Sequence, residues 1–435
     1  MTDPTTRRDF LAASAFAAAS LAATRAGADE PKKAVGANDK ISLGFIGVGG
    51  MGSGLLNIFK TMPDVNVAAL CDVYEPHLLR ARSAVDGKPD TYGDFRKVLE
   101  RKDIDAVVIA TPDHWHAIPA IMACQAGKDV YCEKPLSYRI AEGRAMVDAA
   151  TKYKRVTQMG NLIHAGENYR RVVEIVQSGA LGKVLKARVW LNGDHSGLGS
   201  PDDLSQPPAG VDYDFWLGPA PKRPFNANRF TFNWRYFWDY AGGSLCDFCC
   251  HIIDLVHWAM EVDAPETITA TGGRYGLQDN AETPDTLEVV YHYPKGEKGF
   301  DLVWSSSDVN PRGFEGKSMG IAFYGSEATL VSDYGSHQVF ANKKGAEISL
   351  PPKTLPRSVG HHREWLDAIA SRGQASCHFE YGHRLTSTGH LGNMALLTGE
   401  KLHWDAKAER VTNHEAANQH LSRAEYRAPW TLPKI

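Results

Sequence analysis

The sequence lacks the features of several protein classes. Beyond the N-terminal region, no continuous apolar run approaches the ~18 residues that would cross a bilayer, so we expect no membrane-spanning segment and no membrane partner. The 48 Lys and Arg nearly balance the 51 Asp and Glu, which gives no support for a nucleic-acid partner. We find no internal repeat and no low-complexity tract. A chain of 435 residues has room for two or three domains with independent cores.

The sequence also lacks a recognisable haem or metal motif. Three of its seven cysteines lie close together: Cys246, Cys249 and Cys250. Haem attachment requires C-x-x-C-H, whereas Cys250 separates Cys249 from His251, and no second C-x-x-C recurs to complete a structural zinc site. His361 and Glu364 have the spacing to share a metal, but no third ligand is near them in sequence. We therefore expect no metal, and we interpret the clustered thiols as buried core residues.

The first 28 residues have the pattern of a twin-arginine signal peptide. Arg7 and Arg8 precede an alanine-rich stretch over residues 12–23, and Ala26-Gly27-Ala28 is an A-x-A cleavage site. Residues 29–39 are expected to form a flexible linker. We therefore expect export to the periplasm. Because this route carries folded proteins, a cofactor bound in the cytoplasm can travel with the chain.

The segment from Ile41 to Gly54 organises the first predicted domain. Strand-forming apolar residues lead into Gly47-Val48-Gly49-Gly50-Met51-Gly52, which fits the dinucleotide-binding pattern G-x-G-x-x-G. Gly47 would allow the tight turn, Gly49 would let the backbone approach a pyrophosphate, and Gly52 would let the helix pack closely on the strand. We expect the backbone of this turn, Gly50 and Met51 included, to bind the phosphates at the helix N-terminus.

Asp72 is the residue predicted to select the cofactor. It follows the apolar run over residues 65–71 and lies 20 residues beyond Gly52. A carboxylate at that position accepts hydrogen bonds from ribose hydroxyls and repels a 2′-phosphate. Val73 follows, so no arginine stands directly beside the carboxylate to hold such a phosphate. The sequence therefore favours NAD over NADP.

Two further apolar runs, over residues 105–110 and 129–132, predict buried parallel strands. The first ends at Thr111-Pro112-Asp113-His114-Trp115-His116 and the second at Glu133-Lys134-Pro135. Ligands gather at the carboxyl ends of such strands. The expected cofactor contacts there are Thr111, Pro112, His116, Glu133 and Lys134. Residues 40–159 are thus predicted to form a Rossmann-type domain with a parallel sheet.

Residues 160–435 are predicted to form an α+β domain that binds substrate. We expect a helix over 161–181, a strand over 184–191 and a polar, proline-rich excursion over 193–224. The aromatic-rich segment that follows, up to Trp238, is interpreted as core, with a sugar pocket as the alternative. Alternating residues over 265–331 predict a mostly antiparallel open sheet, whose free face would make a homo-oligomer. Helices are expected from His361 and over 384–399.

A helix predicted to start near Gly242 carries the candidate catalytic pair. Asp247 and His251 are four residues apart, so they share a helical face, and Asp254 lies close to that face. A carboxylate one turn from an imidazole can fix its tautomer and raise its basicity, as a general base requires. On spacing alone, an ion pair that stabilises the helix is the favoured interpretation.

The combined motifs resemble one family. The glycine turn at Gly47–Gly52, the Thr111–His116 segment and Glu133-Lys134-Pro135 are similar to those of the glucose-fructose oxidoreductase / inositol dehydrogenase / MocA family. The resemblance covers nearly the whole chain after the linker. It implies that Lys134 lies near the nicotinamide and the substrate hydroxyl. It also implies that the D-x-x-x-H pair Asp247 and His251 is catalytic.

The resulting hypothesis is an exported NAD(P)-dependent oxidoreductase acting on CH–OH groups of a sugar or polyol. His251 would take the hydroxyl proton and Lys134 would stabilise the alkoxide. Because a periplasm has little free NAD, we expect the cofactor to stay bound and to be regenerated in each cycle. The cycle would then either reduce a second sugar or cleave a glycoside by transient oxidation and elimination, as NAD-dependent glycosidases do. A non-catalytic sugar or nucleotide sensor is the third alternative.

Overall fold

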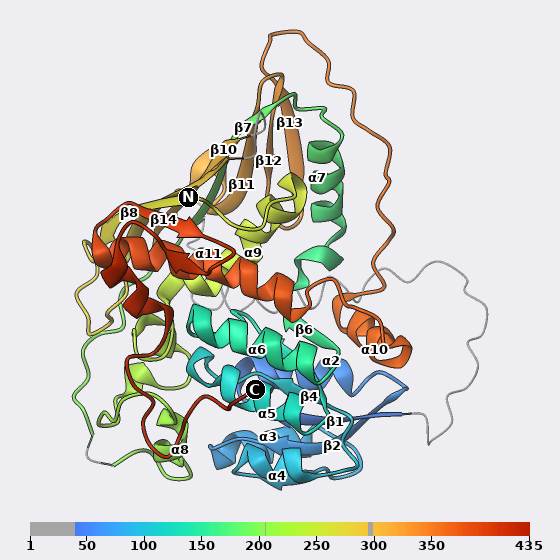
Figure 1. Ribbon diagram of the computed structural model, residues 1–435, viewed down its shortest axis with the longest axis vertical. Coiled ribbons are helices and arrows are strands. Elements are labelled where there is room, and N and C mark those ends of the chain that lie inside the picture. The colour runs from blue at the N-terminus through green and yellow to red at the C-terminus, as the bar shows by residue number, and fades with distance from the viewer. Residues whose placement is uncertain (1–39, 205, 295–298) are drawn as a thin grey trace, which may run out of the picture. The chain divides into compact units, whose positions relative to one another are not determined.

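The computed structural model describes residues 40–204, 206–294 and 299–435, which contain two sheets and their covering helices (Figure 1). The predicted signal peptide and linker, residues 1–39, lie outside the described residues. Every described helix is too short or too polar to cross a membrane. All seven cysteines are buried and unpaired, which confirms the interpretation of the clustered thiols.

The first sheet is parallel throughout, with the strand order β3-β2-β1-β4-β5-β6. Its strands are β1 (Ile41–Ile46), β2 (Val65–Cys71), β3 (Asp90–Tyr92), β4 (Ala106–Ile109), β5 (Asp129–Glu133) and β6 (Thr157–Gly160). Its helices are α2 (Gly50–Phe59), α3 (Glu75–Ser83), α4 (Phe95–Glu100), α5 (Ala117–Gln125) and α6 (Ile140–Lys152). The predicted Rossmann-type topology is confirmed. The order reverses between β1 and β4, and the carboxyl edge beside that reversal is where open α/β sheets bind ligands.

The second sheet has nine strands in the order β13-β12-β11-β7-β10-β9-β8-β14-β15. Its strands are β7 (Val184–Asn192), β8 (Thr267–Gly273), β9 (Thr286–Tyr293), β10 (Phe300–Ser307), β11 (Met319–Gly325), β12 (Ala328–Ser332), β13 (His337–Ala341), β14 (Leu402–Asp405) and β15 (Arg410–Val411). The mostly antiparallel sheet is confirmed, although β7 and β10 pair in parallel. Strands β12 to β15 were not expected, since they are short and weakly alternating.

The remaining helices differ from the predictions mainly at their ends. They are α7 (Glu167–Gln177), α8 (Tyr213–Leu217), α9 (Gly243–Met260), α10 (His361–Ser371) and α11 (Phe379–Thr398). The helix expected over 161–181 is interrupted because Gly166 has an extended backbone, which separates the 3-10 turn η3 (Leu162–Ala165) from α7. Helix α11 begins five residues before the predicted start at Arg384.

The last part of the chain returns to the first sheet. Trp365 of α10 is fully buried, and its ring lies 5.7 Å from that of Phe59 in α2 and 5.6 Å from that of Tyr131 in β5. Figure 1 shows α10, in orange, beside the blue elements of this sheet. A single boundary near residue 160 therefore does not separate the two cores in space.

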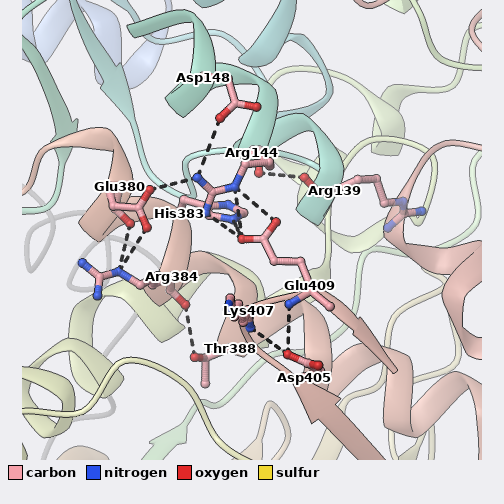
Figure 2. A network of polar contacts seen from close by, with 12 residues as sticks. Arg139, Arg144, Asp148, Glu380, His383, Arg384, Thr388, Asp405, Lys407 and Glu409 are labelled. Atoms are coloured by element: carbon pink, nitrogen blue, oxygen red, sulfur yellow. Dashed lines mark hydrogen bonds and ion pairs between the residues drawn. The ribbon is translucent and has the colours of Figure 1, made fainter. Parts of the chain in front are cut away.

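An ion network joins α6 to α11 (Figure 2). The guanidinium of Arg144 lies 3.0 Å from a carboxylate oxygen of Glu380 and 2.7 Å from one of Glu409. Glu409 also lies 2.8 Å from Nε2 of His383. Glu409 precedes β15, so this network links three separate segments of the chain.

The aromatic-rich segment around Trp216 to Tyr240 is mostly core, as the interpretation favoured. Its buried members are Trp216, Phe225, Phe230, Trp234, Phe237 and Tyr240. Phe232 is exposed, and Tyr236 and Trp238 are half-buried. The side chains of this segment that remain accessible are therefore few.

Candidate active site

The glycine turn has the geometry that a dinucleotide phosphate requires. Gly47 has φ +85°, and a Cβ there would lie 2.7 Å from the carbonyl oxygen of Ala110. A Cβ on Gly52 would lie 2.0 Å from the carbonyl oxygen of Gly47. Among the described residues, no side chain caps α2 at Gly49 and no acidic residue occupies its first turn. The first N–H groups of α2 can therefore point at an anion.

The middle of this turn is open to a ligand. A Cβ on Gly50 would meet no atom within 4 Å, and the side chain of Met51 is 47% exposed. At Gly49 a Cβ would lie 3.1 Å from the ring of His77, so the backbone there is accessible from one side only. The residues present fit a bound pyrophosphate, as expected for this motif.

Asp72 does more than the sequence indicated. It follows β2, and one carboxylate oxygen accepts a hydrogen bond from the N–H of Val48 at 2.9 Å while the other accepts one from the N–H of Tyr74 at 2.9 Å. Its carboxylate therefore fixes the glycine turn. The oxygen bound to Val48 also lies 3.4 Å from Nδ1 of His77, whereas the oxygen bound to Tyr74 has a further lone pair that can accept from a ribose hydroxyl.

The segment after β4 mostly holds the fold together. Both ring nitrogens of His116 contact carbonyl oxygens, Nδ1 with Pro135 at 2.8 Å and Nε2 with Thr111 at 2.9 Å. Burial lowers the pKa of His116, and the ring is 1% exposed. The predicted direct cofactor contact by His116 is therefore replaced by a positioning role, because its ring joins the two loops that carry Thr111 and Lys134. Thr111 and Pro112 are half-buried, at the edge itself.

Glu133 ends β5 and is 7% exposed. Burial raises its pKa to about 7, although the neighbouring charge of Lys134 acts in the opposite direction. Its carboxylate lies against β6, where a Cβ on Gly160 would meet it at 2.5 Å. Glu133 therefore lies beside the predicted nicotinamide site without an ion pair to Lys134 through its side chain.

Lys134 and Asp247 form the centre of the site. Nζ of Lys134 donates to a carboxylate oxygen of Asp247 at 2.7 Å and to the carbonyl oxygen of the same residue at 2.9 Å. Burial disfavours the charged amine, but the carboxylate outweighs burial, so the pKa of Lys134 is raised. The pKa of Asp247 is lowered because the charges of Lys134 and Arg235 together outweigh its burial. This pair connects the carboxyl end of β5 to α9.

Helix α9 presents one partly accessible stripe to this pair. In its first three turns the half-buried side chains are Ser244, Asp247, Phe248 and His251, whose spacing places them on one face. His251 thus lies one turn from Asp247, as the spacing predicts. The two expected catalytic residues and Lys134 come together in the fold.

The electrostatic relation between Asp247 and His251 differs from the expectation. The carboxylate of Asp247 binds Lys134, and burial together with the charge of Lys134 lowers the pKa of His251 to about 3. Asp247 acts in the opposite direction but is outweighed. The imidazole is therefore neutral at ordinary pH, which leaves a ring nitrogen able to accept a proton, while the expected increase in basicity is absent.

Asp254 does not belong to this stripe, because it is fully buried in another network. Its carboxylate accepts hydrogen bonds from Asn161 at 2.9 Å and from Tyr381, and it lies 3.2 Å from Nε2 of His164. The Sγ atom of Cys377 lies within 4.8 Å of a ring nitrogen of His164 and of a carboxylate oxygen of Asp254. We interpret this group as a hydrogen-bonded core network, since each oxygen of the Asp254 carboxylate already has a protein partner.

Arg235 is the site residue that sequence reasoning missed. It lies in η5 (Asn233–Tyr236), and its Nε lies 3.4 Å from the same carboxylate oxygen of Asp247 that binds Lys134. The only sequence signal was a cation inside an aromatic-rich segment. Such a cation is commonly a surface residue, and nothing in the spacing connects it to Lys134.

Comparison with known proteins agrees with this geometry. Residues 41–161 match the family described as "Oxidoreductase family, NAD-binding Rossmann fold", and residues 165–299 match that family's C-terminal alpha/beta domain. The chain belongs to the Gfo/Idh/MocA oxidoreductase family. Its Rossmann domain is therefore an NAD-binding domain, and the resemblance drawn from the motifs is confirmed.

Relatives of this chain include proteins named glycosyl hydrolase family 109. That of Saccharopolyspora erythraea is 33% identical over 206 residues, covering 42% of this chain and 45% of the relative, and one from Shewanella sp. strain ANA-3 is 34% identical over 201 residues. The chain thus spans less than half the length of the curated relatives it matches.

Solved structures of the family have the same fold at low identity. The WlbA dehydrogenase from Bordetella pertussis, in complex with NADH and UDP-GlcNAcA, has a TM-score of 0.65 at 17% identity and covers 84% of this chain and 99% of its own. A levoglucosan dehydrogenase in complex with NADH and L-sorbose has a TM-score of 0.62 at 20% identity, with coverage of 84% and 99%.

Proposed function

We propose that this protein is an exported oxidoreductase that transfers a hydride between a sugar or polyol hydroxyl and a tightly bound NAD. The observation that carries this proposal is the ion pair of Lys134 with Asp247, one helical turn from a neutral His251 and at the carboxyl edge of the first sheet. An acid, a base and a nucleotide turn then meet in one place. A sensor would need the nucleotide turn alone.

Each residue has a role that follows from its surroundings. The nicotinamide, when bound, accepts a hydride from the substrate carbon or returns it. The ammonium of Lys134 donates a hydrogen bond to the substrate oxygen and stabilises the negative charge that develops there. The neutral ring of His251 accepts the hydroxyl proton. Asp247 keeps Lys134 charged and fixes its direction.

A second candidate function is glycoside cleavage without net redox change. The names of the curated relatives favour it, and so does the expectation that a periplasmic enzyme regenerates its own cofactor. In this cycle, oxidation of a ring hydroxyl would acidify a neighbouring C–H. Loss of that proton and of the glycosidic group would leave an unsaturated ketone, and water would add to it before the ketone is reduced. His251 and Lys134 would serve both the oxidation and the final reduction.

The test begins with the purified protein before any substrate is added. The nucleotide released by denaturation should be NAD or NADH, close to one per chain. The intact protein should then cleave nitrophenyl glycosides without added NAD if the second candidate holds, or should interconvert two sugars if it does not. Protein that carries no nucleotide and turns over only with added NAD would contradict the tightly bound cofactor.

We also propose a homo-oligomer through the outer face of the second sheet. Glu288, Val290 and His292 of β9 are exposed on that face, and Val290 pairs in register with Val303 of β10. Arg188 of β7 extends the same row. Sedimentation of the wild-type protein should give a dimer or larger species. Val290→Glu should shift it toward the monomer, whereas Glu347→Lys, an exposed charge change outside the sheet, should not.

A further inference from the structure

Contacts with neighbouring residues of its own segment hold the Arg235 side chain in place. Its Nη1 donates to the carbonyl oxygen of Phe232 at 3.0 Å. Its guanidinium lies 4.4 Å from the ring centroid of Phe232 and 4.3 Å from that of Trp234. Two aromatic faces and one carbonyl thus fix the plane of the cation. In the part of the chain that the structure describes, Nη2 donates no hydrogen bond, since the polar contacts of this guanidinium are those of Nη1 with Phe232 and of Nε with Asp247.

The site contains more positive charge than its carboxylate balances. Lys134 and Arg235 both approach one oxygen of Asp247, at 2.7 Å and 3.4 Å, while His251 is neutral. The Lys134 side chain is 9% exposed and that of Arg235 is 19% exposed, so water screens this surplus only in part.

Two neighbouring carboxyls do not remove the surplus. Burial raises the pKa of Asp113 well above its ordinary value and that of Glu133 to about 7. Both carboxyls are close enough to Lys134 and Arg235 for Coulombic interaction. The described contacts nevertheless include no ion pair from either carboxyl to those cations. Burial therefore favours the neutral form of both carboxyls, and neither forms an ion pair with Lys134 or Arg235.

We propose that the substrate is a sugar carrying an oxyanion substituent, such as a uronate carboxylate, a sulfate or a phosphate, and that Arg235 binds this group. This inference rests on the proposed function and names its substrate class. The free Nη2 and the second N–H of Nη1 form the end of the guanidinium fork, which matches two oxygens of such a group. Lys134, bound by Asp247, remains the donor to the reacting oxygen.

The experiment measures sugar binding to the protein with its nucleotide bound, by titration calorimetry. The paired probes are D-glucuronate with D-glucose, D-galacturonate with D-galactose, and glucose 6-phosphate and glucose 6-sulfate with glucose. Arg235→Gln removes the charge, and Arg235→Lys keeps the charge but loses the fork. Lys222→Gln, at an exposed residue of the excursion over 193–224 that precedes Arg235, is the control for a general loss of one positive charge.

We expect at least one anionic probe to bind the wild-type protein about tenfold or more tightly than its neutral partner. Arg235→Gln should remove this preference and leave the neutral sugar unchanged, Arg235→Lys should restore part of it, and Lys222→Gln should behave as wild type. The three anions distinguish a carboxylate from a sulfate or phosphate.

The inference is overturned if no anion is preferred, including the case in which no probe binds. It is also overturned if Arg235→Gln weakens neutral and anionic sugars equally, since Arg235 would then act through Asp247. The proposed function has a separate readout, the change in absorbance of the bound nicotinamide when a sugar is added. A neutral sugar that reduces the bound cofactor without any anion preference would leave the oxidoreductase intact and exclude the anionic substrate.

Discussion

Two clusters of charged side chains join the first sheet's domain to later parts of the chain, and they balance their charges differently. Around Arg144, the carboxylates of Asp148, Glu380 and Glu409 face two arginines and His383 (Figure 2). Around Asp247, one carboxylate faces two cations. In the first cluster each arginine has a carboxylate partner, as expected of a cluster that only holds segments together. A cluster that leaves a cation uncompensated has a charge to offer to a ligand or to a developing oxyanion.

The largest expected effect comes from removing the ammonium at the second cluster. Lys134→Ala should lower turnover by about 10²–10³-fold or more, because the donor to the reacting oxygen is lost. Nucleotide content should stay nearly unchanged, since the glycine turn and Asp72 are untouched. Assays of turnover and of released nucleotide on the same preparation check both parts.

The matched control for that variant lies in the other cluster. Arg144→Ala also removes a long, positively charged side chain. The turnover of this variant should equal that of the wild type. If Arg144→Ala were as inactive as Lys134→Ala, the distinction between the two clusters would be lost. Unchanged turnover in Lys134→Ala would contradict the proposed mechanism directly.

A smaller effect on stability is expected at the compensated cluster. Arg144→Ala leaves the carboxylate of Glu409, 20% exposed, without its closest arginine. Arg144 itself is 34% exposed, so solvent screens part of the loss, and we expect the free energy of unfolding to fall by about 1–2 kcal/mol. Denaturant unfolding followed by circular dichroism measures it. An unfolding curve identical to the wild type would show that the network contributes nothing measurable.

The fold was largely predictable from local patterns, and the site only in part. Apolar runs ending in Gly47, Thr111 and Lys134 predicted parallel strands with ligand residues at one edge, because burial on both faces leaves a clear signal. The alternation over 265–331 predicted β8 to β11 of the second sheet, whereas β12 to β15 were not predicted. The return of α10 onto the first sheet had no such signal, since an amphipathic helix does not state which core it covers.

Contacts between distant segments were the part that could not be predicted. Spacing placed Asp247 and His251 on one helical face, but it could not show that Lys134 takes the carboxylate or that Arg235 approaches it. A motif likewise could not show that both ring nitrogens of His116 contact backbone carbonyl oxygens. Periodicity encodes which residues share a face. It does not encode what lies opposite that face.

Acid should affect the compensated cluster through Glu409. Burial raises the pKa of this carboxyl, but hydrogen bonds from His383 and Arg144 outweigh it and lower the pKa from 4.5 to about 2. The stability that this shift provides is present above the unfolded value of 4.5 and is lost as pH falls toward 2. Unfolding measured between about pH 6 and 3 should therefore be less pH-dependent in Glu409→Gln than in the wild type. Equal slopes would contradict the lowered pKa.

The smallest expected effect is the absence of a titration at the other cluster. An ordinary histidine base, with a pKa near 6.5, would give an acid limb in kcat/KM at that pH, because protonation removes the acceptor. Burial and the charge of Lys134 lower the pKa of His251 to about 3, so the imidazole stays neutral well below neutral pH. The profile of kcat/KM should then lack a limb from His251 between about pH 8 and 5, whereas His251→Asn should be slow at every pH in this range.

A limb near 6.5 that disappears in His251→Asn would mean that the surplus positive charge beside this residue is neutralised in the working enzyme. The contrast between the two clusters would then hold only for the protein without its ligands.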